Sequence, residues 1–210
     1  MKGNFKRNLF IGFSASLIIL IISSTASFIS ISTLLKNNDW VNHTREVIYN
    51  LNECNAIMVN AQTSMRGFLI TGNEDFLDQY EGTKQVSEEY INKIKVLTDD
   101  NAQQQKTLNE LKYLKDEFYK YLEVRISLKK LGRTVSAEDL NIGKGLMDKL
   151  RSVFKRLENE EQKLLKERMS ASDNYGTYSR ILIIAAAIIA LIISILFFIR
   201  ILKDYNERSK

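Results

Sequence analysis

The side chains that most often carry chemistry in proteins are scarce in this sequence of 210 residues. It has one cysteine, Cys54, and one histidine, His43. A single cysteine allows no internal disulfide, and a single histidine cannot form a two-histidine metal site or a zinc finger. We expect Cys54 to be a small buried apolar residue, with a disulfide between two copies as the alternative. We expect His43 to be a polar residue on a helix surface or seam near a membrane.

The acidic residues offer no better case for catalysis. They alternate with lysines at positions that would be solvated on a helix, as in the run from Glu158 to Lys163, and they form no isolated carboxylate pair. Serines are plentiful, but no nucleophile motif accompanies them. The sequence therefore predicts a chain that is not an enzyme and that holds no metal ion and no cofactor.

The net charge of +5 is carried by two short tails. The charged residues of these tails are Lys2, Lys6, Arg7, Arg200, Lys203, Asp204, Glu207, Arg208 and Lys210. Between Lys36 and Arg180 the basic and acidic residues cancel. Because the excess charge is confined to the tails, the sequence predicts no nucleic-acid partner.

Two apolar segments are long enough to cross a bilayer, which needs roughly 20 apolar residues. We predict transmembrane helices at residues 9–31 and 181–199, a cytoplasmic tail at 1–8 and the start of a cytoplasmic helical connector at 200–210. The basic tails place both termini in the cytoplasm and residues 36–179 outside, in the periplasm. Aromatic residues would then lie in the headgroup zone at the outer ends of the spans, namely Trp40, Tyr175 and Tyr178. The sequence therefore predicts a two-pass protein of the inner membrane.

The first apolar segment has an alternative interpretation as a cleavable signal peptide. The residues Ser24-Thr25-Ala26 are similar to a cleavage site made of small residues. We favour the membrane hairpin, because apolar residues continue beyond Ala26 as far as Leu35.

Small residues recur every four positions in both apolar segments, and they are Gly12, Ser16, Ser23, Ser27, Ala186, Ala190 and Ser194. Such rows allow helix backbones to approach closely in lipid. The alternative is that alanine and serine are simply common in membrane helices, so specific packing stays open.

Between the apolar segments, apolar residues recur at helical spacings of three and four. This pattern predicts four helices, with apolar seams running over residues 40–68, 76–97, 108–126 and 147–168. Gly72 is suited to a left-handed helix end and Asn73 to the next N-cap, while Ser136 with Asp139 would cap the fourth helix. The second helix is expected to run without a break up to the turn at 98–101.

Short connections make consecutive helices antiparallel neighbours. We therefore predict an all-α fold, an antiparallel up-down-up-down four-helix bundle. Its first and fourth helices should be continuous with the two transmembrane helices, because no proline or glycine-rich linker intervenes.

The run MRGFLITGNEDFLDQY, from Met65 to Tyr80, resembles the signature of CHASE3 domains, the third type of CHASE domain. The residues that carry this likeness are Arg66, Gly67, Phe68, Leu69, Thr71, Gly72, Phe76, Leu77 and Tyr80. The residues from Trp40 to Val47 are similar to the family's opening, and those at 147–151 and 160–168 are similar to its closing helix. The resemblance covers residues 37 to 170.

The resemblance implies an extracellular sensory domain of the kind found on bacterial histidine kinases, chemoreceptors and cyclases. It implies a homodimer in the bilayer, a small molecule or periplasmic protein as signal, and a cytoplasmic output module in cis or in trans. Residues 200–210 contain no phosphorylatable histidine. We therefore expect either a fragment of a longer receptor, with a histidine kinase as parent, or a sensor that borrows its output. The alternative from another class is a membrane-anchored scaffold that senses no ligand.

Three charged residues stand out as candidate sites. Arg66 would either bind an anionic ligand or pair with a neighbouring acid while Gly67 permits close helix approach, and we favour the second interpretation. Glu161 and Arg168 lie seven residues apart on the fourth seam, where polar groups usually fix register or oligomeric state, with a buried ligand site as the alternative. The sequence names no ligand.

Overall fold

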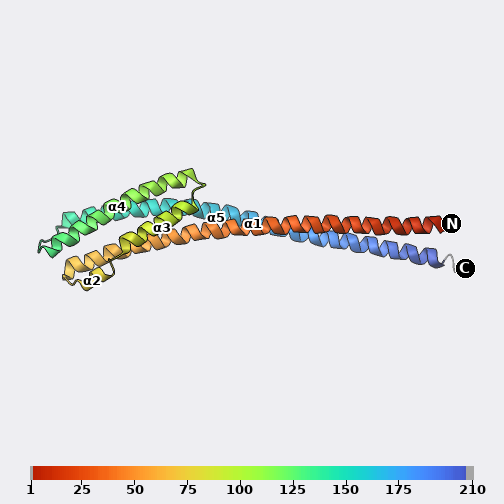
Figure 1. Ribbon diagram of the computed structural model, residues 1–210, viewed down its shortest axis with the longest axis horizontal. Coiled ribbons are helices and arrows are strands. Elements are labelled where there is room, and N and C mark those ends of the chain that lie inside the picture. The colour runs from red at the N-terminus through yellow and green to blue at the C-terminus, as the bar shows by residue number, and fades with distance from the viewer. Residues whose placement is uncertain (1, 207–210) are drawn as a thin grey trace. The chain divides into compact units, whose positions relative to one another are not determined.

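The computed structural model describes the backbone of residues 2–206 and the side chains of residues 7, 10–14 and 16–203 (Figure 1). The described residues form α-helices and no strands. The helices are α1 (Lys2–Thr71), α2 (Asp75–Asp78), α3 (Thr83–Leu97), α4 (Ala102–Lys130) and α5 (Ala137–Asn206). The predicted all-α fold is confirmed.

Two compact units make up the chain. One consists of residues Met1–Trp40 and Glu167–Lys210, and the other of residues Val41–Lys166. The helices α1 and α5 each contribute to both units, because each is a single helix of 70 residues. The prediction that the first and last long helices of the bundle continue into the apolar segments is confirmed.

The unit Val41–Lys166 is a helical bundle built from α3, α4, the carboxyl-terminal part of α1 and the amino-terminal part of α5 (Figure 1). The predicted seam of α1 faces its core, and every seam residue from Thr44 to Phe68 is at most 2% exposed. Burial of one Leu or Met side chain contributes roughly 1.5–3 kcal/mol. The largest buried partners on the other helices are Ile91, Ile94, Leu111, Phe118, Tyr119, Leu122, Met147 and Leu150.

Gly72 and the Ser136–Asp139 pair end and begin helices as predicted, and Asn101, which the sequence analysis placed only in a turn, caps α4. Gly72 follows α1 with φ 72°, a left-handed conformation, and its N–H donates to the Phe68 carbonyl. The Asn101 side chain accepts hydrogen bonds from the first turn of α4. Ser136 Oγ accepts from the Asp139 N–H, and the Asp139 carboxylate accepts from the Ser136 N–H, a reciprocal capping box.

The prediction of one unbroken second helix is wrong. The structure divides this segment into α2 and α3, with a turn between them that ends at Gly82, where φ is 76°. Apolar spacing misled the prediction, because Tyr80 and Thr83 keep the helical period across the turn. The first helical residue of α2 is Asp75, so Glu74 rather than Asn73 occupies the N-cap. Asn73 Oδ1 still accepts a hydrogen bond from the Asp75 N–H, at 3.0 Å.

The other unit contains the two apolar segments, and each is long and apolar enough to cross a membrane. The predicted connector at 200–210 is helical as far as Asn206, while Met1 and residues 207–210 lie outside the described residues. Gly12 faces the ring of Phe197 and leaves no room for a Cβ atom. A gap of about 400 Å³ between the segments is lined by several of the small residues, namely Ser16, Ser23, Ala186, Ala190 and Ser194.

Candidate functional site

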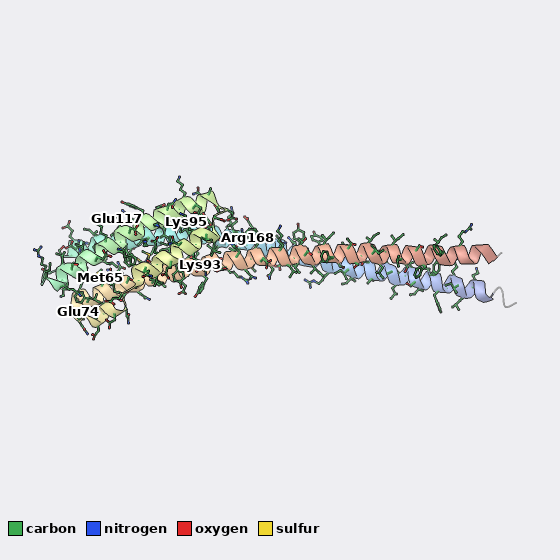
Figure 2. The ribbon with its side chains drawn as sticks, viewed as in Figure 1. Met65, Glu74, Lys93, Lys95, Glu117 and Arg168 are labelled. Atoms are coloured by element: carbon green, nitrogen blue, oxygen red, sulfur yellow. The ribbon has the colours of Figure 1, made fainter. Side chains whose placement is uncertain are left out.

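The signature residues build the turn that joins α1 to α2. A Cβ atom at Gly67 would lie 2.7 Å from Cε1 of Phe76, so only glycine lets the Phe76 ring pack on α1 here. Thr71 Oγ1 donates to the Gly67 carbonyl at 2.8 Å and accepts from the Asn73 N–H at 3.1 Å. Figure 2 labels Glu74, the last residue of this turn, and Met65, which precedes the signature residues. The close approach expected at Gly67 is therefore made by an aromatic ring.

The remaining signature side chains divide into core and surface. Phe68 and Leu77 are buried, and Leu69 and Tyr80 are half-buried against the same core. Arg66 is exposed, and none of the described carboxylates lies within ion-pair distance of it. The neighbouring acid expected for Arg66 is thus not found among the described side chains.

A polar network ties the start of α5 to α4. Arg125 forms an ion pair with Asp139, and its guanidinium lies 5.0 Å from the centroid of the Tyr121 ring. The Tyr121 hydroxyl donates to the Asp139 carbonyl at 2.8 Å. Gly143 makes room for this ring, since a Cβ there would lie 2.6 Å from its hydroxyl oxygen. Hydrogen bonds from Ser136 lower the pKa of the Asp139 carboxyl.

A second polar cluster, centred on Lys115, joins α3 and α4. Lys115 is 2% exposed, and its ammonium contacts the carboxylates of Glu88 and Asp116. Burial opposes its charge, but the hydrogen bonds to these carboxylates outweigh burial and raise the Lys115 pKa. Hydrogen bonds from Lys112 and Lys115 lower the pKa of Glu88. Sequence reasoning missed this cluster because only apolar residues were assigned to the seam, although Lys115 lies four residues after Leu111 and three before Phe118 on the buried face of α4.

Cys54 lies in the core beside α3. Its side chain is 0% exposed, and Sγ donates to the Ser87 carbonyl at 3.6 Å. Burial raises the pKa of the thiol to about 12, which keeps it protonated and unreactive. This environment agrees with its interpretation as a small buried residue.

Glu161 and Arg168 lie in different units of the chain. In the bundle, Glu161 is 3% exposed and accepts a hydrogen bond from the buried side chain of Gln104 on α4. In the other unit, the Arg168 guanidinium lies 4.7 Å from the centroid of the Trp40 ring and donates to the Trp40 carbonyl at 3.4 Å. His43 is half-buried on α1. Glu161 thus serves the bundle core, whereas Arg168 and Trp40 join the two long helices beside the apolar segments.

Comparisons with known proteins give one family and one solved structure. The family model of the CHASE3 domain matches residues 37–171. No curated protein sequence matches the chain. A crystal structure of the Rhodopseudomonas palustris histidine kinase HK9 sensor domain is similar over 62% of this chain and 95% of that chain, with 21% identity and a TM-score of 0.38.

Proposed function

The chain belongs to the CHASE3 domain family, and from this membership we propose that it is the input module of a bacterial sensor histidine kinase. CHASE3 domains are extracellular, sensory and non-catalytic, so the bundle is a sensory domain. The two apolar helices that could span a membrane support a membrane-bound receptor. The kinase would follow in the same chain or associate in trans, and the module would act as a homodimer in the bilayer.

The proposed topology has both termini in the cytoplasm of an inner-membrane protein and residues 36–179 in the periplasm. The basic residues outside each span support it. This topology can be tested with reporter enzymes that are active only in the cytoplasm or only in the periplasm. The reporters are fused after Lys2, Thr98 and Lys210. We expect cytoplasmic activity at both ends and periplasmic activity at Thr98. Cytoplasmic activity at Thr98, or cleavage of the chain near Ala26, would overturn the hairpin.

The proposed mechanism is movement of whole helices. The observation that carries it is the continuity of α1 and α5, each a single helix that runs from the bundle into an apolar segment. Packed helices shift between discrete arrangements rather than deform, so a signal on the bundle would slide, tilt or rotate these helices. Changing the population from mostly off to mostly on takes roughly 5.5 kcal/mol of differential binding.

A kinase module fused after Lys210 tests this mechanism through the packing of the spans. Ala190 lines the gap between the apolar segments, whereas Ala185 does not. Ala190→Leu should shift kinase activity and the disulfide crosslinking of single cysteines along residues 181–199, in a Cys54→Ala background. Ala185→Leu is the matched control and should change neither.

Two results would contradict this proposal. Unchanged activity and crosslinking in Ala190→Leu, together with changes in Ala185→Leu, would refute the packing. Unchanged kinase activity for every substitution in both spans would refute relay through the membrane and favour a membrane-anchored scaffold.

A further inference from the structure

A polar groove lies between α1 and α5 inside the bundle unit. Its lining, here named the α1–α5 groove, consists of Leu51, Asn52, Asn55, Arg151, Phe154, Lys155, Glu158, Asn159 and Gln162. Leu51 and Phe154 are buried and form its apolar floor. Its volume of about 330 Å³ lies at the lower end of the range for small-molecule sites, which often occur between helices of bundles. The groove therefore has room for a molecule of amino-acid size.

Three other helix pairs of the bundle are joined by ion pairs between side chains. Lys93 of α3, labelled in Figure 2, pairs with Glu46 of α1 at 3.0 Å. Lys84 of α3 pairs with Glu123 of α4 at 2.7 Å. A third pair, Arg156 with Glu110, links α5 to α4 at 2.7 Å. Across the α1–α5 groove, by contrast, the described side chains form no hydrogen bond and no ion pair, although seven polar side chains converge there.

One acceptor inside the groove is buried without a donor. The Asn55 side-chain oxygen, Oδ1, is out of contact with solvent and accepts no hydrogen bond from any described residue. A buried polar atom is normally hydrogen-bonded in a folded protein, so its lack of a donor needs an explanation. Rotation of the Asn55 side chain toward the groove would expose this oxygen to a ligand N–H group, which would supply the missing donor.

The charged residues of the groove follow an order along α5. Arg151 and Lys155 come first, and Glu158 lies one turn later, about 4.5 Å further along the helix axis. The ion pair that Arg151 forms with Asp148 is 3.4 Å long, and both side chains are more than half exposed, so it competes weakly with a ligand. Among described residues, Lys155 and Glu158 form no ion pair. A ligand with a carboxylate close to an ammonium group matches this order.

From this arrangement we propose that the α1–α5 groove binds a free α-amino acid. The carboxylate of the amino acid contacts Arg151 and Lys155. Its ammonium donates to Glu158 and, once the Asn55 side chain has rotated toward the groove, to Asn55 Oδ1. The consequence for signalling rests on the proposed function: the ligand would bridge the two helices that continue into the spans and bias their arrangement. Binding itself does not depend on that function.

Calorimetric titration of the full chain in detergent micelles, with each of the standard L-amino acids in turn, tests the proposal. At least one should bind saturably. Its N-acetyl and methyl ester derivatives, which remove one charge each, should bind at least about tenfold more weakly, since hydrogen bonds to charged groups are the strong ones. Absence of saturable binding by every amino acid at millimolar concentration would overturn the proposal. Binding of both derivatives as tightly as the unmodified amino acid would also overturn it.

Substitutions in the groove test whether the amino acid binds there. Lys155→Ala and Asn55→Leu should each weaken binding at least about tenfold while circular dichroism remains unchanged. Lys149→Ala, which changes an exposed lysine on the same helix outside the groove, is the matched control and should bind like the parent chain. Arg151→Gln provides a second test if Asn55→Leu fails to fold. Binding that survives both Lys155→Ala and Arg151→Gln would refute the site.

A second copy of the chain covering the groove is the competing explanation, and crosslinking separates the two. If the groove is open to ligands, the variant Asn52→Cys, made in a Cys54→Ala background, should remain monomeric under oxidising conditions. Efficient disulfide formation between copies, unaffected by amino acids, would overturn the proposal. The kinase-fusion test of helix movement uses no ligand, so its failure and the failure of amino-acid binding are distinguishable.

Discussion

Replacement of Glu88 should destabilise the bundle more than replacement of Lys115. Lys115 is nearly inaccessible, and its ammonium contacts Glu88 and Asp116, whereas the Glu88 side chain is 30% exposed. Glu88→Gln leaves the buried ammonium with Asp116 as its remaining carboxylate partner. Removing one partner of a fully buried pair costs about 3–5 kcal/mol. Because Asp116 remains and Glu88 is partly solvated, we expect about 1–3 kcal/mol.

Lys115→Met removes the buried charge together with its desolvation penalty and keeps the volume of the side chain. An apolar residue of similar size in place of a buried ion is often neutral or stabilising. Glu88 then retains Lys112 at 2.8 Å and partial solvation. We therefore expect Lys115→Met to change the free energy of unfolding by less than about 1 kcal/mol.

Thermal unfolding of the full chain in detergent, followed by circular dichroism, measures both effects. For a domain of this size, 1 kcal/mol corresponds to a shift of about 4 °C in Tm. Glu88→Gln should lower Tm by about 4–12 °C and Lys115→Met by less than about 4 °C. Lys112→Met, which changes an exposed lysine that binds the same carboxylate, is the control for loss of charge alone. A larger loss in Lys115→Met than in Glu88→Gln would refute the reasoning.

The pH dependence of these variants follows from the direction of the Glu88 shift. Its pKa is lowered from 4.5 in the folded chain, because Lys112 and Lys115 donate hydrogen bonds to the carboxylate. The stabilisation is therefore fully present above about pH 4.5 and is lost as the pH falls through the lower folded-state pKa. The Tm difference between the parent chain and Glu88→Gln should be constant near neutral pH and shrink in acid.

Three further predictions concern the turn, the cap and the thiol. Gly67→Ala should destabilise the parent chain. In a Phe76→Ala background the same substitution should stabilise the chain by up to about 1 kcal/mol, because only the helix preference of alanine then remains. Equal effects in both backgrounds, measured by thermal unfolding, would show that Phe76 does not constrain Gly67. Ser136→Ala should cost about 1 kcal/mol through loss of the α5 cap, while Ser152→Ala, at an exposed position within α5, should change stability by less than about 0.5 kcal/mol in the same assay. Cys54 should react with a soluble thiol reagent at pH 8 only after unfolding, and rapid modification of the folded chain would show that the bundle opens around it.

The sequence predicted the parts of the fold that depend on short-range rules. The seam of α1 repeats at three and four residues, and each of its bundle positions is buried as that period requires. Gly72 and the Ser136–Asp139 pair act where local backbone geometry alone demands them. The break before α3 escaped prediction, because Gly82 interrupts the backbone while the apolar period continues through it.

The polar clusters could not be predicted in this way, because they depend on which helix faces meet. The period of α4 places Lys115 on its buried face, but only the packing of α3 on α4 brings Glu88 to its ammonium. Arg66, the most distinctive charged residue of the signature, is exposed, and the tight constraint falls on its neighbour Gly67. A signature of this kind therefore reports the construction of a turn.

The same reasoning explains why a binding site can lie outside the signature. Residues that build the turn between α1 and α2 are needed by any bundle of this design, whatever its ligand. Leu51 and Phe154 on the floor of the α1–α5 groove belong to the core, but its polar residues contribute little to it, because they form no hydrogen bond or ion pair across the groove among the described side chains. Those positions can change chemistry without loss of the fold. Because they lie on the two helices that reach the apolar segments, a ligand bound there would act directly on the elements that the proposed mechanism moves.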